Sequence, residues 1–343
     1  MEAQGAYHLG SLAAGCWAIF SLTDGVVRVV WVILSTLTHR ESGVAATETQ
    51  LQRAFRKFEE LIRSFAAIEN LSLYDGRRLF AIWVRQFPIP EGVSTSFIYP
   101  KGLPCITVQP KGPTPARTIL HIHGGAFSSG NGSDFLAMGA AIALAADARV
   151  VLAEYRLAPE HAYPAGSNDC FSIYQGLLDL DVDPLKLCIS GDSAGATLVL
   201  LTMISARKLG LPLPAAASIF SPWVDLSMSS DTYVSVKDPM ATRESLQPYL
   251  TAYLKDQNAA DPAISPFFAD LTGLPPLLIQ VGSEEVFVGE AEVLANRAKA
   301  SGVNTTLDIA AGMPHIWHLF ASFLPEAKDA IQRIADFFKE HVR

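Results

Sequence analysis

One serine stands between two glycines where two apolar stretches meet, in the segment LCISGDSAGATL. Ser193 forms a G-x-S-x-G pattern with Gly191 and Gly195, after a predicted strand and before a predicted helix. A sharp turn at such a junction exposes the serine hydroxyl, and small neighbours let strand and helix approach closely. The helix N-terminus also favours negative charge developing at the serine. The pattern predicts a nucleophile, although a turn that merely connects two elements could have the same composition.

A histidine is the expected base, because a serine hydroxyl is a weak nucleophile by itself. The best placed of the eight histidines is His315, which lies in AAGMPHIWHLF, after a late predicted strand and before the last predicted helix. His318 is the competing candidate, three residues further on. Alternatively, His315 could be a surface loop residue with no catalytic role.

A carboxylate is expected to hold the imidazole in the right tautomer and to balance its charge. The segment LLIQVGSEEVF ends a predicted strand between Ser193 and His315 in the chain and supplies Glu284 and Glu285 side by side. Either carboxylate could serve. We predict Glu284, because it comes first after the strand, and both could also be solvated loop acids.

Backbone amides are expected to stabilise the negative oxygen of a tetrahedral intermediate. The segment HIHGGAFSSG follows an early predicted strand and offers the amides of Gly125 and Ala126, next to His123 and Gly124. Ala194, directly after the serine, offers a third amide. These groups predict an oxyanion hole.

A metal site is the other chemistry that this loop could suggest. His121 and His123 share one face of the predicted strand, but no carboxylate or cysteine lies at a matching spacing. We therefore expect no metal. Acyl transfer through a serine needs no cofactor, and we expect none.

The chemical residues lie at the ends of elements that alternate along the chain. Short apolar runs alternate with helical patterns, which predicts a mostly parallel sheet with helices on both faces. The strands are expected at 117–123, 148–155, 186–190, 215–222, 275–283 and 304–310, and the helices at 135–147, 167–180, 194–210, 289–302 and 325–342.

One segment interrupts the alternation. Residues 223–268 lie between two predicted core strands and contain a helical pattern near 243–255. We predict a catalytic domain over 76–343 with a cap insertion at about 227–260. The N-terminal segment 1–75 is predicted to add helices to the same cap.

The N-terminal segment contains a strongly apolar stretch, residues 9–38, which carries Asp24, Gly25 and Arg28 in its middle. Buried charge disfavours a spanning helix, and the stretch lacks a basic leader and a clear cleavage site. Two interpretations stay open: association with a membrane surface or a helix that covers the pocket.

Composition narrows the class of protein. The chain has 343 residues, half of them hydrophobic, and a net charge of −8, which disfavours a nucleic-acid surface. Its four cysteines form no C-x-x-C pair, which fits neither a zinc site nor a disulfide framework. Free thiols indicate a reducing compartment, so we expect a cytoplasmic protein with membrane association as the alternative. A homodimer also stays open. The cysteines are Cys16, Cys105, Cys170 and Cys188.

Taken together, these motifs resemble the hormone-sensitive-lipase-like family of α/β-hydrolases, over roughly residues 95–340. The resemblance rests on HGGAF, YRLAPEHAYPA, GDSAG, SPWVDL, DPAISP and GMPH, in this order. It implies a serine carboxylester hydrolase with a helical cap, an α/β-hydrolase fold, no cofactor and a small-molecule ester as substrate. Two positions depart from the family pattern: Ala126 replaces the third loop glycine, and Glu284 replaces the usual aspartate.

The resemblance also assigns structural roles near the site. Asp192, beside the nucleophile, is expected to support the turn. Arg156, Glu160 and Asp169 are expected to form a buried polar network.

Three functions remain to be distinguished. The first is hydrolysis of a small to medium hydrophobic ester through an acyl-enzyme on Ser193. The second uses the same acyl-enzyme for acyl transfer or lactone formation. The third is a ligand-binding protein that has kept the scaffold without the reaction, against which stand the nucleophile, base and acid that are all present.

Overall fold

The computed structural model describes residues 72–238 and 240–342. The chain divides into two compact units, residues 1–70 and 71–343, and the description below concerns the second. The predicted membrane-surface stretch at 9–38, Cys16 and almost all of the predicted cap segment 1–75 lie outside the described residues. None of the helices between 72 and 342 that the structure describes is long and apolar enough to cross a bilayer.

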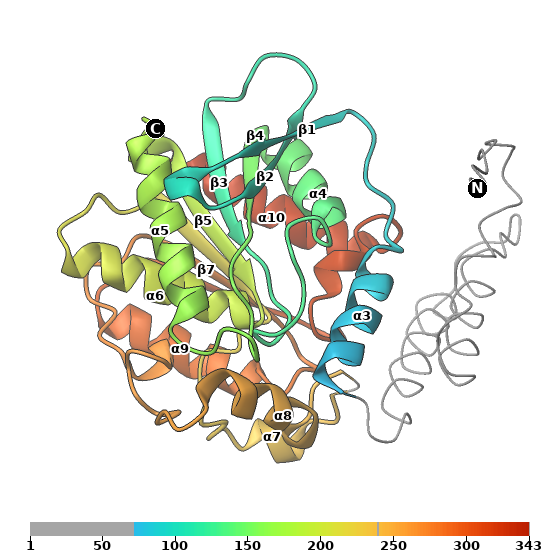
Figure 1. The fold of residues 1–343 in the computed structure, drawn as a ribbon, viewed down its shortest axis with the longest axis vertical. Coiled ribbons are helices and arrows are strands. Elements are labelled where there is room, and N and C mark those ends of the chain that lie inside the picture. Colours follow the sequence, from blue (N-terminus) through green and yellow to red (C-terminus); the bar gives the residue numbers. More distant parts are fainter. Residues whose placement is uncertain (1–71, 239, 343) are drawn as a thin grey trace, which may run out of the picture. The chain divides into compact units, whose positions relative to one another are not determined.

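A mostly parallel sheet forms the centre of the described unit (Figure 1). Its strands have the order β1-β2-β4-β3-β5-β6-β7-β8. β1 pairs antiparallel with β2, and β2 with β4, whereas the remaining pairs are parallel. The strands are β1 (Val93–Ile98), β2 (Cys105–Pro110), β3 (Arg117–Ile122), β4 (Ala148–Ala153), β5 (Leu187–Asp192), β6 (Ala216–Phe220), β7 (Leu277–Gly282) and β8 (Thr305–Ala310).

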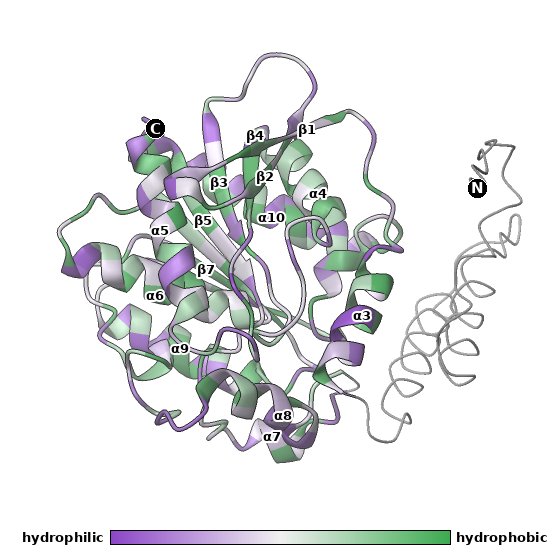
Figure 2. Ribbon diagram, in the orientation of Figure 1, coloured by the Kyte–Doolittle hydropathy of each residue, from purple (hydrophilic) through white to green (hydrophobic). Residues whose placement is uncertain are grey.

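Helices pack against this sheet. α4 contacts α10, β2 and β4, and α5 contacts α6. Figure 2 shows α4 as almost uniformly hydrophobic, which fits its burial between the sheet and α10. The helices are α3 (Leu73–Val84), α4 (Leu136–Ala146), α5 (Ala165–Asp179), α6 (Ala194–Lys208), α7 (Thr232–Ser235), α8 (Arg243–Leu254), α9 (Val288–Ala300) and α10 (Pro325–His341), with short 3₁₀ turns at Pro100–Gly102, Pro184–Lys186, Pro266–Phe268 and Trp317–Phe320.

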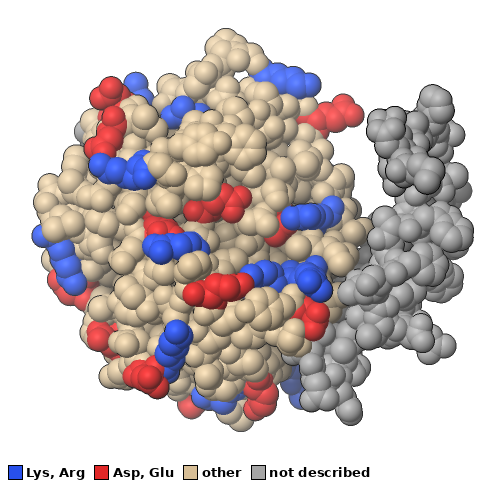
Figure 3. All heavy atoms as spheres, viewed as in Figure 1, with Lys and Arg blue, Asp and Glu red and all other residues tan. Residues whose placement is uncertain are grey.

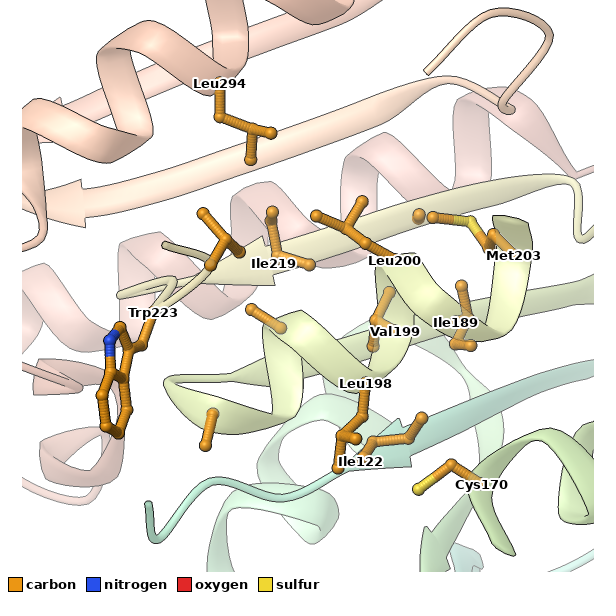
Figure 4. Close-up of a cluster of buried hydrophobic side chains, with 14 of the residues drawn as sticks. Ile122, Cys170, Ile189, Leu198, Val199, Leu200, Met203, Ile219, Trp223 and Leu294 are labelled. Atoms are coloured by element: carbon orange, nitrogen blue, oxygen red, sulfur yellow. The ribbon is translucent and has the colours of Figure 1, made fainter. Parts of the chain in front are cut away.

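The core between strands and helices is apolar and closely packed. Figure 4 shows Leu198 of α6 beside Ile122 of β3 and Val199 of α6 beside Ile189 of β5, while Leu294 of α9 lies farther away in the same buried cluster. All five are essentially inaccessible to solvent. Burial of this kind stabilises a fold by about 25 cal/mol per Å² of apolar surface removed from water. The apolar runs that predicted the strands therefore also fix the strand ends that carry the chemical residues.

The predicted α/β-hydrolase fold is confirmed. The sequence patterns predicted neither the antiparallel strands β1 and β2 nor the helices α3 and α7. β1 is an edge strand whose middle residues are exposed. Its sequence, VSTSFI, therefore lacks the apolar pattern of a buried strand.

The insertion between β6 and β7 contains α7 and α8. α8 begins with a capping box, in which Thr242 and Ser245 each accept a hydrogen bond from the other's backbone amide. Tyr253 of α8 stacks on Phe127 in the loop after β3, with ring centroids 3.9 Å apart. The backbone of Tyr253 also accepts a hydrogen bond from the amide of Tyr163, before α5. The insertion therefore packs against two loops at the carboxyl ends of the strands.

The described surface has no large basic area on the face drawn in Figure 3. There, acidic and basic side chains are interspersed, often as neighbours. Recognition of a phosphate backbone needs clustered Lys and Arg, and this face carries no such cluster.

Candidate active site

Ser193 lies at a sharp turn between the end of β5 and the start of α6. Its backbone has φ 50° and ψ −123°, a sparsely populated conformation for a residue with a side chain. Its amide donates to the carbonyl of Phe220, which holds the turn. A Cβ on Gly195 would lie 2.0 Å from the carbonyl oxygen of Ile122. The glycine is therefore required by close contact between α6 and β3, as the sequence predicted.

His315 lies in the loop after β8 and reaches the serine. Its Nε2 is 3.0 Å from Ser193 Oγ, although 122 residues separate the two in the chain. Both side chains are almost fully buried. The competing His318 is also buried, but its Nε2 is 3.0 Å from Gln280 Oε1 instead.

Glu285, not Glu284, is the acid beside the histidine. Its Oε2 lies 2.8 Å from Nδ1 of His315. Its other oxygen accepts hydrogen bonds from Ser221 Oγ at 2.8 Å and from the amide of Gly282 at 2.6 Å. Glu284 is exposed, and its carboxylate accepts from Ser283 Oγ. The prediction of Glu284 is therefore wrong, and Glu285, the alternative, occupies the position.

The physical reason is the turn that follows β7. Because Glu285 accepts the amide of Gly282, three residues earlier, the chain folds back and turns this side chain inward. The amide of Glu284 donates to the carbonyl of Met313 at 3.2 Å, while its side chain points to solvent. Order after the strand, on which the prediction rested, does not decide which side chain faces inward.

The electrostatics of the pair favour a base that is ready to accept a proton. Burial alone would lower the pKa of His315, but the hydrogen bond and charge of Glu285, with Asp238 and Asp192, raise it above 6.5. Burial raises the pKa of Glu285, and the proximity of His315 opposes that rise. Since a carboxylate accepts from Nδ1–H, Nε2 is left as acceptor for the serine hydroxyl.

The loop after β3 brings backbone amides to the serine. A Cβ on Gly124 would lie 2.9 Å from the Cβ of Ser193, so the two segments are in close contact. Gly125 and Ala126 have φ 105° and φ 52°. Within the described residues, no hydrogen bond occupies the amides of Gly125, Ala126 or Ala194. All three remain available to a negative oxygen at this site.

Buried polar side chains hold this loop. Asp192 accepts from the amide of Gly124 at 3.1 Å and lies 3.3 Å from Nε2 of His121. His123 donates from Nδ1 to the carbonyl of Gly124 at 2.7 Å and stacks on Tyr155. Burial lowers the pKa of His123 to about 4, which keeps the ring neutral. Each of these two histidines makes a hydrogen bond through Nδ1, His121 with Ser190 Oγ at 2.9 Å and His123 with the carbonyl of Gly124.

Helix α3 adds contacts that the sequence did not predict. Arg77 donates from Nε to the carbonyl of Ser128 at 2.6 Å and from Nη2 to the carbonyl of Ala158 at 2.8 Å. Arg85 donates to Asp134 at 2.6 Å. Both arginines therefore tie α3 to the loop that carries the free amides. No local pattern could have revealed them, because each partner lies about fifty residues or more away in the chain.

The predicted buried network of Arg156, Glu160 and Asp169 is wrong in its connections. Arg156 pairs with Asp169 through two side-chain hydrogen bonds of 2.8 Å, and its own side chain is half exposed. Glu160 pairs instead with Arg77 at 2.8 Å. The polar residues form two separate, partly exposed ion pairs, in which Asp169 alone is buried, because α3 supplies a second arginine.

The strand order and the turn at Ser193 define an α/β-hydrolase, and the model of the alpha/beta hydrolase fold family matches residues 119–319. An acetyl-hydrolase from Streptomyces hygroscopicus is 37% identical over 225 residues, which cover 65% of this chain and 75% of the relative. An esterase from Acinetobacter venetianus is 35% identical over 224 residues, 64% of this chain and 74% of the relative.

Solved structures give the same result. An esterase of the bacterial hormone-sensitive lipase family has a TM-score of 0.82 at 35% identity and covers 87% of this chain and 100% of its own. A hormone-sensitive lipase from a metagenome library has a TM-score of 0.79 at 34% identity, with 84% and 98% covered. The chain belongs to the hormone-sensitive-lipase-like family of α/β-hydrolases, and its enzyme class is that of the carboxylesterases.

Proposed function

We propose that this protein hydrolyses a small to medium hydrophobic carboxylic ester through an acyl-enzyme on Ser193. The observation that carries the proposal is the chain of contacts from Glu285 to His315 to Ser193, with distances of 2.8 and 3.0 Å. Hydrogen bonding in this order is what activates a serine hydroxyl. Similarity to an acetyl-hydrolase supports a short acyl group.

In the first half of the reaction, Ser193 Oγ attacks the ester carbonyl while Nε2 of His315 takes the hydroxyl proton. The carbonyl oxygen becomes negative and accepts hydrogen bonds from the amides of Gly125, Ala126 and Ala194. Glu285 stabilises the imidazolium that forms. The tetrahedral intermediate then expels the alcohol, which receives the proton from His315, and the acyl group stays on the serine.

The second half repeats these steps with water. His315 takes a proton from water, the resulting oxygen attacks the acyl carbonyl, and the same three amides stabilise the negative charge. The carboxylic acid leaves as the proton returns to Ser193 Oγ. Atoms and charge balance without a metal or an organic cofactor.

The insertion at 227–260 supplies a cover for this site in the proposed enzyme. Its Tyr253 stacks on Phe127, which directly follows Ala126 in the oxyanion loop. Trp223 and Phe287 continue the aromatic cluster beside the base, since the rings of Phe287 and His315 lie 4.9 Å apart. Aromatic surroundings of this kind favour a hydrophobic substrate.

The proposal predicts a pH dependence. His315 must be neutral to accept a proton, and its pKa is raised above 6.5 by Glu285 and the neighbouring carboxylates. Activity should therefore fall as the pH drops through a value above that of an exposed histidine. The measurement is kcat/KM for a chromogenic ester between about pH 5 and about pH 9. An acidic limb at or below 6.5 would contradict the assigned environment of the base.

Covalent labelling tests the proposal directly. A fluorophosphonate reacts only with an activated serine, so the full chain should be labelled, and peptide mass mapping should place the adduct on Ser193. Absence of labelling would favour a ligand-binding protein on the same scaffold.

Turnover of an ester series in the presence of a competing alcohol then separates two enzyme reactions. Free acid as the main product supports hydrolysis. A new ester as the main product would support acyl transfer in its place.

A further inference from the structure

A buried carboxylate from the insertion reaches the loop that carries the acid. Asp238 lies between α7 and α8 and is only 6% exposed. Its Oδ2 accepts a hydrogen bond from the amide of Val286 at 3.1 Å. Its Oδ1 accepts from the amides of Met240 at 2.8 Å and Ala241 at 3.1 Å, which hold the chain just before α8. One side chain therefore joins the insertion to the residue that follows Glu285.

A second contact from the insertion holds the same residue. The hydroxyl of Thr232, in α7, donates to the carbonyl of Val286. Both polar groups of the Val286 backbone are thus bound by the insertion, one by Asp238 and one by Thr232. Because Val286 directly follows Glu285 in the chain, these two contacts restrict how the carboxylate of Glu285 can move relative to His315.

Asp238 also contributes to the charge around the base. The charges that raise the pKa of His315 are those of Glu285 in the acid loop, Asp238 in the insertion and Asp192 at the end of β5, and Glu285 is also hydrogen-bonded to it. His318, nearby on the following turn, stays neutral because burial lowers its pKa well below the ordinary value. Each of the three carboxylates favours the imidazolium form of the base.

We propose that Asp238 is a positioning residue for the Glu285–His315 pair, which fixes the acid loop through Val286 and places a second negative charge beside the base. This inference rests on the proposed function, since it concerns the same base. With this role for Asp238, the insertion both covers the active site and supports the Glu285–His315 pair.

Three substitutions in the full chain separate charge from positioning. D238N removes the charge and keeps one acceptor oxygen, which can bind either the amide of Val286 or the amides of Met240 and Ala241, so the acidic limb of kcat/KM should move to lower pH. D238A removes the oxygen as well, and the plateau of kcat should fall about tenfold, as expected for a small misplacement of a catalytic group. T232V releases the carbonyl of Val286 together with the hydroxyl of Ser230 and leaves the charge of Asp238 in place, so it should lower the plateau of kcat without moving the acidic limb.

The matched control is D256N, which removes the charge of an exposed aspartate in the same insertion. Its pH profile should overlay that of the wild-type protein, while thermal unfolding and circular dichroism report the fold of each variant. A D238N protein that does not fold, or that folds with an unmoved acidic limb, would overturn the proposal. If the wild-type protein shows no ester turnover that depends on Ser193, the proposed function is refuted instead.

Discussion

Replacement of Ser193 by alanine should lower kcat for a small ester about a millionfold, close to the rate that binding and the oxyanion amides support alone. The reason is that no other hydroxyl in the described residues lies beside His315 Nε2, which is 3.0 Å from Ser193 Oγ. Initial rates with a p-nitrophenyl ester, at enzyme concentrations high enough to measure the residual activity, provide the test.

The variant should keep its fold. Alanine retains the Cβ of serine, so the backbone at φ 50° is strained no more than before, and the side chain makes no other hydrogen bond in the described structure. Ser205→Ala, on the same helix α6, is the matched control and should retain wild-type rates. Turnover by Ser193→Ala beyond a thousandth of the wild-type rate would disprove the role of this serine, since a nucleophile contributes far more.

Replacement of Glu285 by glutamine should lower kcat about ten-thousandfold, whereas Glu284→Gln should leave it within about twofold. The carboxylate of Glu285 accepts from Nδ1 of His315 at 2.8 Å. An amide can present its NH₂ group there, which stabilises the opposite tautomer and removes the acceptor that the serine needs. The two adjacent residues form a closely matched pair, because the same atoms change in each.

Steady-state rates of both variants, with circular dichroism as a check of the fold, decide the assignment. A large loss in Glu284→Gln together with a small loss in Glu285→Gln would reverse it. Equal and small losses would show that this enzyme tolerates an imidazole without a carboxylate partner. Fluorophosphonate labelling should follow the same order, because it depends on the same activated serine.

The local sequence predicted much of the fold and of the site. The apolar runs predicted six of the strands and six of the helices, α8 among them, since an alternation of buried strands and helices reflects which side chains must leave water. Gly191, Ser193 and Gly195 predicted the nucleophile turn, because contact between strand and helix excludes side chains at these positions. The strand, the turn and the helix follow one another in the chain, so a short segment was enough to identify the pattern, although the glycines also contact Ile122 of β3.

Other features depended on contacts between distant parts of the chain. β1 escaped prediction because an exposed edge strand carries little apolar pattern. Arg77 acts on a carbonyl 51 residues away, and Asp238 binds an amide 48 residues away. The sequence pattern of a single helix or strand cannot predict hydrogen bonds between residues so far apart in the chain.

The choice between Glu284 and Glu285 shows where the limit lies. The sequence by itself determined that a carboxylate follows β7, that His315 follows β8 and that Ser193 follows β5, because strand and turn patterns are local. Only the tertiary structure decided which carboxylate faces the base. Glu285 turns inward because Gly282, Ser221 and His315 donate to it, and the last two are 64 and 30 residues away. A buried carboxylate needs such donors, and they meet only when the sheet has formed.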